Sequence, residues 1–278
     1  MNKVKFISES AFGNKYKFPK IDLEKMKLFN DADIIELWKL ENRPKIREKL
    51  NIFLRSYLKF ALKNPGFIKS FVIPRMISSV GELLDINKTN DKSHNLTSFK
   101  KLLVDTYNRR VNIALAFQPK TLLEIGTYFG WGAASFKKGI PKCKVYTMSP
   151  KDSSVNNPVK ENETGYFYKK KNLNIIQIWS DSTKFNYSKL PKIDVVYIDG
   201  NHSFDFIYKD LENTSKIVDK CIIIDDYLPK GETNKEAHFY GPWNNDVVKA
   251  TNDFIIDNPD IFRKIFWIKN TRLCLLIK

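Results

Sequence analysis

A short apolar run followed closely by three glycines is the feature that most constrains how this chain folds. Residues 121–132 read Thr-Leu-Leu-Glu-Ile-Gly-Thr-Tyr-Phe-Gly-Trp-Gly, and a helix-compatible segment follows over 133–138. A buried strand, a glycine turn and a helix in this order bring backbone close to a nucleotide-like ligand. The spacing is not G-x-G-x-x-G, and the turn lacks Gly-Lys-Ser/Thr, so neither a dinucleotide fingerprint nor a P-loop is indicated.

Four further apolar runs follow at the spacing typical of alternating strands and helices, over 144–148, 174–178, 194–198 and 221–224. Continuous Val/Ile runs suit strands that are buried on both faces of a parallel sheet. An open α/β sheet binds its ligands at the carboxyl ends of its strands. The polar residues that follow the runs are Ser149, Asp181, Asp199, Asp225 and Asp226. The pattern therefore predicts a binding site at this edge of the sheet.

Three motifs together resemble those of the class I S-adenosylmethionine-dependent methyltransferases. They are Leu-Glu-Ile-Gly-x-x-x-Gly over 123–130, Val-Tyr-Ile-Asp-Gly-Asn-His-Ser-Phe over 196–204, and Ile-Ile-Asp-Asp-Tyr over 223–227. Within that family, the metal-dependent O-methyltransferases that modify macrolide sugars are the most similar branch, and the catechol-type enzymes are more distant. The resemblance extends from about residue 115 to the end of the chain.

The resemblance implies an α/β, Rossmann-like class I methyltransferase fold. We expect a seven-stranded, mostly parallel sheet of order 3-2-1-4-5-7-6, with the last strand inserted antiparallel. A helix over 246–258 and a hairpin built from 262–268 and 272–277 agree with this expectation. The predicted organisation is a helical N-terminal extension, residues 1–110, and a catalytic domain, residues 111–278.

The N-terminal extension lacks the rhythm of strands. Apolar residues recur at helical spacing over 31–39 and 45–63. The polar segment 87–98 is expected to be a loop, and 99–117 a helix that leads into the first strand. We expect these helices to cover the catalytic domain or to form a homodimer contact.

The segment 45–75 leaves a second interpretation open. It is rich in Lys and Arg, with Glu48 as its only acid. A basic amphipathic helix of this kind also lies on anionic membrane surfaces. Burial of its apolar stripe needs no further partner and is the preferred interpretation, since large apolar patches are seldom left exposed.

The resemblance also implies S-adenosylmethionine as the methyl donor. The residues that would bind it are Glu124, Gly126, Thr127, Tyr128, Gly130, Ser149, Asp181 and Asp199. Glu124 would lie near the amino group, and the glycine loop beneath the methionine part. The family usually holds the ribose hydroxyls with an acid after the second strand. Here Ser149 stands in that place and makes no charge-assisted pair, so Asp152 is the alternative ribose ligand.

The adenine end of the cofactor has its own candidates. Asp181, after the third strand, matches the acid that usually lies near the adenine amino group. Trp179 and Phe185 are candidates to pack on the ring, or are core residues.

Three carboxylates, those of Asp199, Asp225 and Asp226, are expected to converge from two adjacent strand ends. They repel one another unless a cation is present, and Mg²⁺ prefers such oxygen ligands. These three acids are the predicted metal ligands. A bound cation would lower the pKa of the acceptor hydroxyl, and His202 would take its proton. His202 and Asp199 are the predicted catalytic residues; the alternative is that both motifs form capped turns.

Composition limits the class of partner. The net charge of +16 is spread along the 278 residues without a recognised nucleic-acid module, so no nucleic acid is expected. Cys143, Cys221 and Cys274 lack metal-type spacing and predict reduced thiols. The sequence has no long apolar run and no signal-peptide pattern, so we expect a cytoplasmic protein without a transmembrane segment.

The predicted function is a divalent-metal-assisted O-methyltransferase that acts on a hydroxyl of a sugar, glycoside or polysaccharide-related small molecule. The segment 228–245 is polar and aromatic, and its Tyr240 and Trp243 are candidates to face a sugar ring. The alternatives are a metal-independent methyltransferase of another small molecule or lipid, and a non-catalytic cofactor-binding protein on the same fold.

Overall fold

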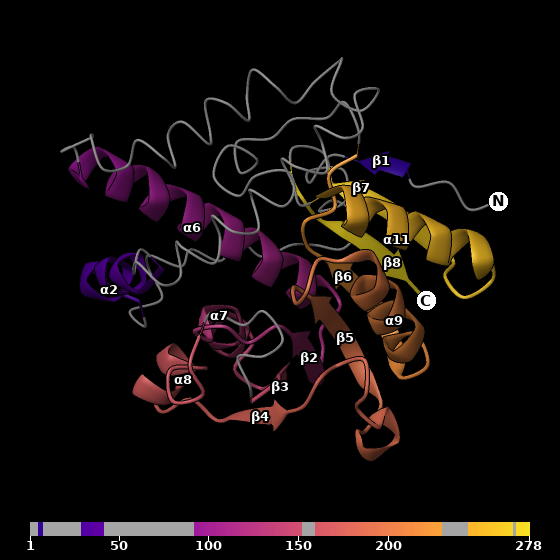
Figure 1. Cartoon of the computed structure of the whole chain (residues 1–278), viewed down its shortest axis with the longest axis horizontal. Helices are drawn as coiled ribbons and strands as arrows, with labels where there is room; N and C mark the ends of the chain where they lie inside the picture. The colour runs from indigo at the N-terminus through magenta and orange to yellow at the C-terminus, as the bar shows by residue number, and fades with distance from the viewer. Residues whose placement is uncertain (1–4, 8–28, 42–91, 152–158, 230–243, 269–270) are drawn as a thin grey trace.

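A mixed β-sheet lies at the centre of the computed structural model, which describes residues 5–7, 29–41, 92–151, 159–229, 244–268 and 271–278 (Figure 1). Within these residues the strand order is β1-β7-β8-β6-β5-β2-β3-β4. The strands are β1 (Lys5–Ile7), β2 (Thr121–Ile125), β3 (Lys144–Ser149), β4 (Ile175–Trp179), β5 (Ile193–Ile198), β6 (Val218–Ile224), β7 (Lys264–Ile268) and β8 (Cys274–Ile277).

The strand order confirms the predicted fold. Counted from β2 to β8, the order along the sheet is 3-2-1-4-5-7-6, and β8 runs antiparallel to both β6 and β7. Strand β1 pairs in parallel with β7 at the edge of the sheet and was not expected. Three residues are too few to show a strand period in the sequence.

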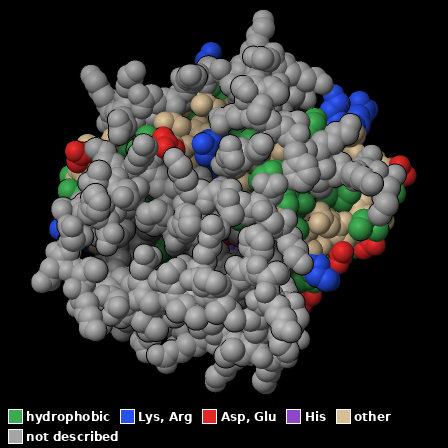
Figure 2. All heavy atoms as spheres, turned by 90° about the horizontal axis from the view of Figure 1, so that it is seen from above, with side chains coloured by type: hydrophobic (Ala, Val, Ile, Leu, Met, Phe, Trp, Pro, Cys, Tyr) green, Lys and Arg blue, Asp and Glu red, His purple; other side chains and the backbone are tan. Residues whose placement is uncertain are grey.

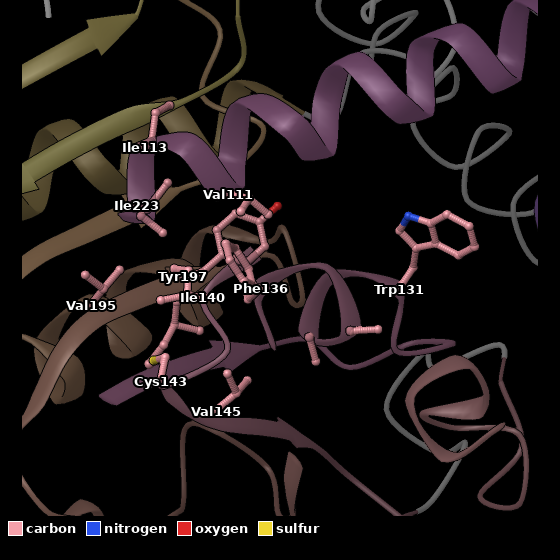
Figure 3. Close-up of a cluster of buried hydrophobic side chains, with 14 of the residues drawn as sticks. Val111, Ile113, Trp131, Phe136, Ile140, Cys143, Val145, Val195, Tyr197 and Ile223 are labelled. Carbon is pink, nitrogen blue, oxygen red and sulfur yellow. The ribbon is translucent and has the colours of Figure 1, made fainter. Parts of the chain in front are cut away.

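Helices cover both faces of the sheet because each strand is apolar on both sides. The helices α2 (Asp31–Glu41), α6 (Lys92–Ala116), α7 (Trp131–Gly139) and α8 (Tyr166–Lys170) share one core cluster with the sheet. The helices α9 (Phe204–Thr214) and α11 (Asn244–Asp257) share the other. Figure 3 shows the first cluster, in which Phe136 of α7 meets Tyr197 of β5 with ring centroids 5.2 Å apart.

Two predictions for the N-terminal part can be compared with the structure. Helix α2 confirms the helical pattern over 31–39. The loop expected over 87–98 is wrong from residue 92 onward, because α6 begins there. Residues 92–98 are polar except for Leu96 and contain neither Gly nor Pro, so nothing in them stops a helix. The segments 45–63 and 45–75 lie outside the described residues.

The expected domain boundary at residue 110 falls within α6, which runs without a break into the turn before β2. Ile34 and Leu37 of α2 are buried in the same cluster as α6 and α7. The division of the chain into 1–110 and 111–278 stays a prediction. Within the described residues, the N-terminal helices and the sheet share one core.

Three further expectations concern charge, cysteines and membrane spans. Figure 2 shows the visible Lys and Arg side chains in several separate groups, some of them beside acidic side chains. The thiols of Cys143, Cys221 and Cys274 are buried and free of disulfides, as predicted. Among the helices that the structure describes, none is both long and apolar enough to cross a membrane.

Candidate functional site

The glycine turn between β2 and α7 holds the carboxyl ends of two strands together. Gly126 has φ 104°, and a Cβ on it would lie 2.0 Å from the carbonyl oxygen of Asp199. Gly130 has φ 76°, and a Cβ there would lie 2.6 Å from the ring of Tyr168. Only glycine combines this conformation with so close an approach. The turn therefore lies directly against the end of β5 on one side and α8 on the other.

Glu124 is a buried carboxyl at the end of β2, with 2% of its surface exposed. It accepts a hydrogen bond from Thr147 of β3 at 2.6 Å. Burial raises its pKa to about 8, and the hydrogen bond from Thr147 opposes this rise. A Cβ on Gly132 would lie 2.1 Å from its Oε1 atom, so the carboxyl rests against the first turn of α7.

A chain of polar side chains connects Glu124 to α8. The hydroxyls of Thr127 and Thr147 lie 2.8 Å apart, and Gln177 of β4 donates to Thr127 at 3.2 Å. Tyr168 of α8 donates to Gln177 at 2.6 Å. Thr127 was predicted from the sequence as a cofactor residue, whereas Thr147, Gln177 and Tyr168 were not. A signal was present for Thr147 and Gln177, since each interrupts an otherwise apolar strand.

Ser149, the expected ribose residue, ends β3 and is 5% exposed. Its hydroxyl is buried and makes no hydrogen bond within the part of the chain that the structure describes. It is in register with Trp179 of β4, which lines an open pocket of about 430 Å³ together with Glu161, Asn162 and Lys169. The alternative ribose residue, Asp152, lies outside the described residues.

Asp181, the expected adenine residue, accepts hydrogen bonds from the backbone nitrogen and the hydroxyl of Thr183, at 2.9 and 2.7 Å. It therefore caps the turn after β4, and its role toward adenine stays a prediction. Phe185 packs against Tyr187 with ring centroids 5.2 Å apart, as the core alternative expected. Residues 230–243, including Tyr240 and Trp243, lie outside the described residues.

The strand ends of β5 and β6 bring Asp199, His202 and Asp226 together, as predicted. The His202 Nε2 atom lies 3.6 Å from Oδ1 of Asp199, and its Nδ1 atom lies 3.3 Å from Oδ2 of Asp226. Burial lowers the pKa of His202, but the two carboxylates outweigh this effect and raise it to about 9. Asp226 has φ 60°, in the left-handed region that non-glycine residues seldom adopt.

Two arginines also belong to the cluster. Neither was predicted from the sequence. Arg110 of α6 forms an ion pair with Asp225, and Arg272, just before β8, forms one with Asp226. All four side chains are buried. The Tyr197 hydroxyl has one proton to donate and lies within hydrogen-bond distance of two carboxylates, that of Asp225 and, at 3.0 Å, that of Asp199. No basic partner stands near the acids in sequence, because α6 and the β7–β8 hairpin bring the arginines from distant segments.

These ion pairs decide how well the predicted metal ligands fit Mg²⁺. In the described part of the chain, no group of three or more His, Cys, Asp or Glu side chains is arranged to hold a metal ion. Asp225 and Asp226 already face guanidinium groups, whereas Mg²⁺ requires near-octahedral oxygen ligands at about 2.0–2.1 Å. The set Asp199, Asp225 and Asp226 therefore does not fit the expected cation.

Two of the residues expected to bind S-adenosylmethionine, Ser149 and Glu124, fit that ligand better. A buried, unpaired hydroxyl such as that of Ser149 needs a partner, and a ribose hydroxyl is one. Glu124 offers a carboxyl that an ammonium group would ionise. Both lie at the carboxyl edge of adjacent strands, β2 and β3.

Comparison with known proteins agrees with this geometry. Residues 123–227 match the family model described as a methyltransferase domain. The matched segment extends from β2 to the residues that follow β6. With the strand order, this match identifies the enzyme class as an S-adenosylmethionine-dependent methyltransferase. No curated protein matches the sequence.

Solved structures also resemble the methyltransferase. A putative caffeoyl-CoA O-methyltransferase from Staphylococcus aureus is 16% identical, with a TM-score of 0.46, over 71% of this chain and 98% of that one. An O-methyltransferase from Bacillus cereus in complex with SAH is 14% identical, with a TM-score of 0.42, over 79% and 96%. A SAH-bound methyltransferase from Podospora anserina is 15% identical, with a TM-score of 0.43, over 80% and 95%. None of these likenesses decides the substrate.

Proposed function

We propose that this methyltransferase transfers a methyl group from S-adenosylmethionine to a hydroxyl oxygen of a small molecule, with His202 as the base. The observation that carries the proposal is the position of His202. Its imidazole lies between Asp199 and Asp226, and the glycine turn at Gly126 packs against the backbone of Asp199 and Gly200. The expected methionine end of the cofactor and the expected base are thus at the same point of the sheet.

The residues of the chain would divide the work as follows. Glu124 would hold the cofactor's ammonium group, and Ser149 a ribose hydroxyl. When bound, S-adenosylmethionine supplies an electrophilic methyl group on a sulfonium. His202 would accept the proton of the acceptor hydroxyl, which is needed because an alcohol has a high pKa. Because Asp226 and Asp199 raise the pKa of His202 to about 9, the neutral imidazole that acts as the base is the minor form at pH 7, and turnover should increase as the pH rises toward 9. Holding both reactants in line can lower the activation free energy by about 7–11 kcal/mol.

The acceptor class comes from the sequence resemblance. It is a hydroxyl of a sugar, glycoside or polysaccharide-related small molecule. We keep this acceptor class but propose transfer without a metal ion, because Asp225 and Asp226 face arginines. The position of His202 between the carboxylates of Asp199 and Asp226 supports catalysis over the non-catalytic alternative.

The test is transfer of a labelled methyl group to a panel of sugars, glycosides and phenols by the full chain. His202→Ala should lower turnover by about 10²–10⁴-fold, the usual contribution of a positioned base, while cofactor affinity changes little. His94→Ala is the control substitution. A loss below about fivefold in His202→Ala contradicts the role of His202, and binding of the cofactor without transfer to any acceptor favours the non-catalytic alternative.

A further inference from the structure

Two buried guanidinium groups offset most of the negative charge at the candidate site. Arg110 and Arg272 are 8% and 2% exposed. A guanidinium group stays charged in proteins and matches a carboxylate in shape. The rings of Tyr107 and Tyr197 hold Arg110 in place, with its Cζ atom 4.7 and 5.7 Å from their centroids. Both arginines are therefore fixed parts of the site rather than mobile surface charges.

The carboxylate oxygens that a cation would need are already engaged. Oδ2 of Asp225 accepts from Arg110 and Tyr197, and its Oδ1 accepts from the backbone nitrogen of Asp226 at 2.8 Å. Oδ1 of Asp226 faces Arg272, and its Oδ2 lies 3.3 Å from His202. A cation bound here would displace guanidinium groups and leave them buried without their partners, which is strongly unfavourable.

We propose that Arg110 and Arg272 take the place of a divalent cation in this cluster, so that the site binds no metal ion. Asp225 and Asp226 are then positioning residues: Arg272 fixes Asp226, and Asp226 in turn orients the imidazole of His202. The inference rests on the proposed function for the identity of the site. The arrangement of charges is independent of the acceptor.

Direct measurement of Mn²⁺ binding tests this inference, since Mn²⁺ is a paramagnetic probe for Mg²⁺ sites. The full-length wild type should not enhance water-proton relaxation at micromolar Mn²⁺. Arg272→Gln frees Asp226 and should raise Mn²⁺ affinity at least tenfold, and adding Asp226→Asn should remove the gain. Lys220→Gln is the matched control, because it removes a comparable partner from Asp194, 3.1 Å away at the other end of β5.

Two outcomes overturn the inference. One is stoichiometric Mn²⁺ binding by the wild type that Asp225→Asn abolishes. The other is a folded Arg272→Gln variant that gains no affinity. If that variant does not fold, the wild-type titration decides alone. Methyl transfer is assayed separately with and without chelator. A wild type that binds no Mn²⁺ and methylates no hydroxyl contradicts the proposed function and leaves the inference standing.

Discussion

At the scale of single residues, Ser149 combines a cost to stability with an expected gain in binding. A buried hydroxyl without a partner costs about 1–3 kcal/mol. Ser149→Ala should therefore raise the melting temperature of the cofactor-free protein and weaken S-adenosylhomocysteine binding. Tyr187→Phe is the control, because the Tyr187 hydroxyl is also buried and has no hydrogen-bond partner among the described residues, but it lies in the core cluster shared with α9 and α11. It should raise stability and leave affinity unchanged. Equal effects of both variants on affinity would show that Ser149 is only a core residue.

Glu124 gives a second prediction at this scale, on the pH dependence of stability. Burial raises the pKa of its carboxyl to about 8 from an ordinary 4.5. The folded state therefore binds a proton that the unfolded state has lost between these pH values, and stability falls as pH rises from about 4.5 to 8. The Glu124→Gln variant has no carboxyl at this position to titrate, so it does not lose stability in this way as the pH rises. Its melting temperature should exceed that of the wild type by a margin that grows from pH 5 to pH 8, and a constant margin would contradict the burial argument.

At the scale of elements, hydrogen bonds and ion pairs connect α2 to α8, and a backbone hydrogen bond connects the start of α8 to the glycine turn. We call this connection the brace. Glu36 of α2 accepts from Tyr166 and Lys170 of α8, and Asp33 pairs with Lys171 at 2.7 Å. The backbone nitrogen of Gly165, which precedes α8, donates at 2.9 Å to the carbonyl of Tyr128 in the turn. The N-terminal helix is thus connected to the loop that is expected to contact the cofactor.

This brace predicts a salt-sensitive effect on binding. Glu36→Gln should weaken S-adenosylhomocysteine binding about twofold to fivefold, the range of a partly exposed ion pair, and high salt should abolish the difference. Glu212→Gln is the control, because Glu212 of α9 also pairs with two lysines, Lys209 and Lys216, on the opposite face of the sheet. Calorimetry at low and high salt measures both. Identical affinities for the wild type and Glu36→Gln at low salt would rule out the brace.

The strands and the residues at their ends could be predicted from the sequence, whereas contacts made by distant elements could not. The strands were predictable because buried Val/Ile runs need no partner to be recognised. His202 and its two carboxylates were predictable because neighbouring strand ends must meet. Arg110 and Arg272 were not, because their approach depends on how α6 and the β7–β8 hairpin pack. The loop expected over 87–98 is wrong from residue 92 onward, because polar residues without Gly or Pro do not stop a helix.

At the scale of the whole molecule, the residues proposed to bind the cofactor and those proposed to transfer the methyl group lie at the same edge of the sheet. The ends of β2 and β3 carry Glu124 and Ser149, and those of β5 and β6 carry the cluster around His202. Arginines from α6 and from the turn before β8 close the cluster. The account therefore assigns cofactor binding and methyl transfer to adjacent halves of the same edge.

Calorimetric titration of the full chain with S-adenosylhomocysteine tests this central claim most directly, because it needs no knowledge of the acceptor. The account predicts saturable binding at one site per chain, unaffected by chelator and at least tenfold weaker in Glu124→Gln. The absence of binding at millimolar ligand would contradict the account, as would unchanged affinity in Glu124→Gln.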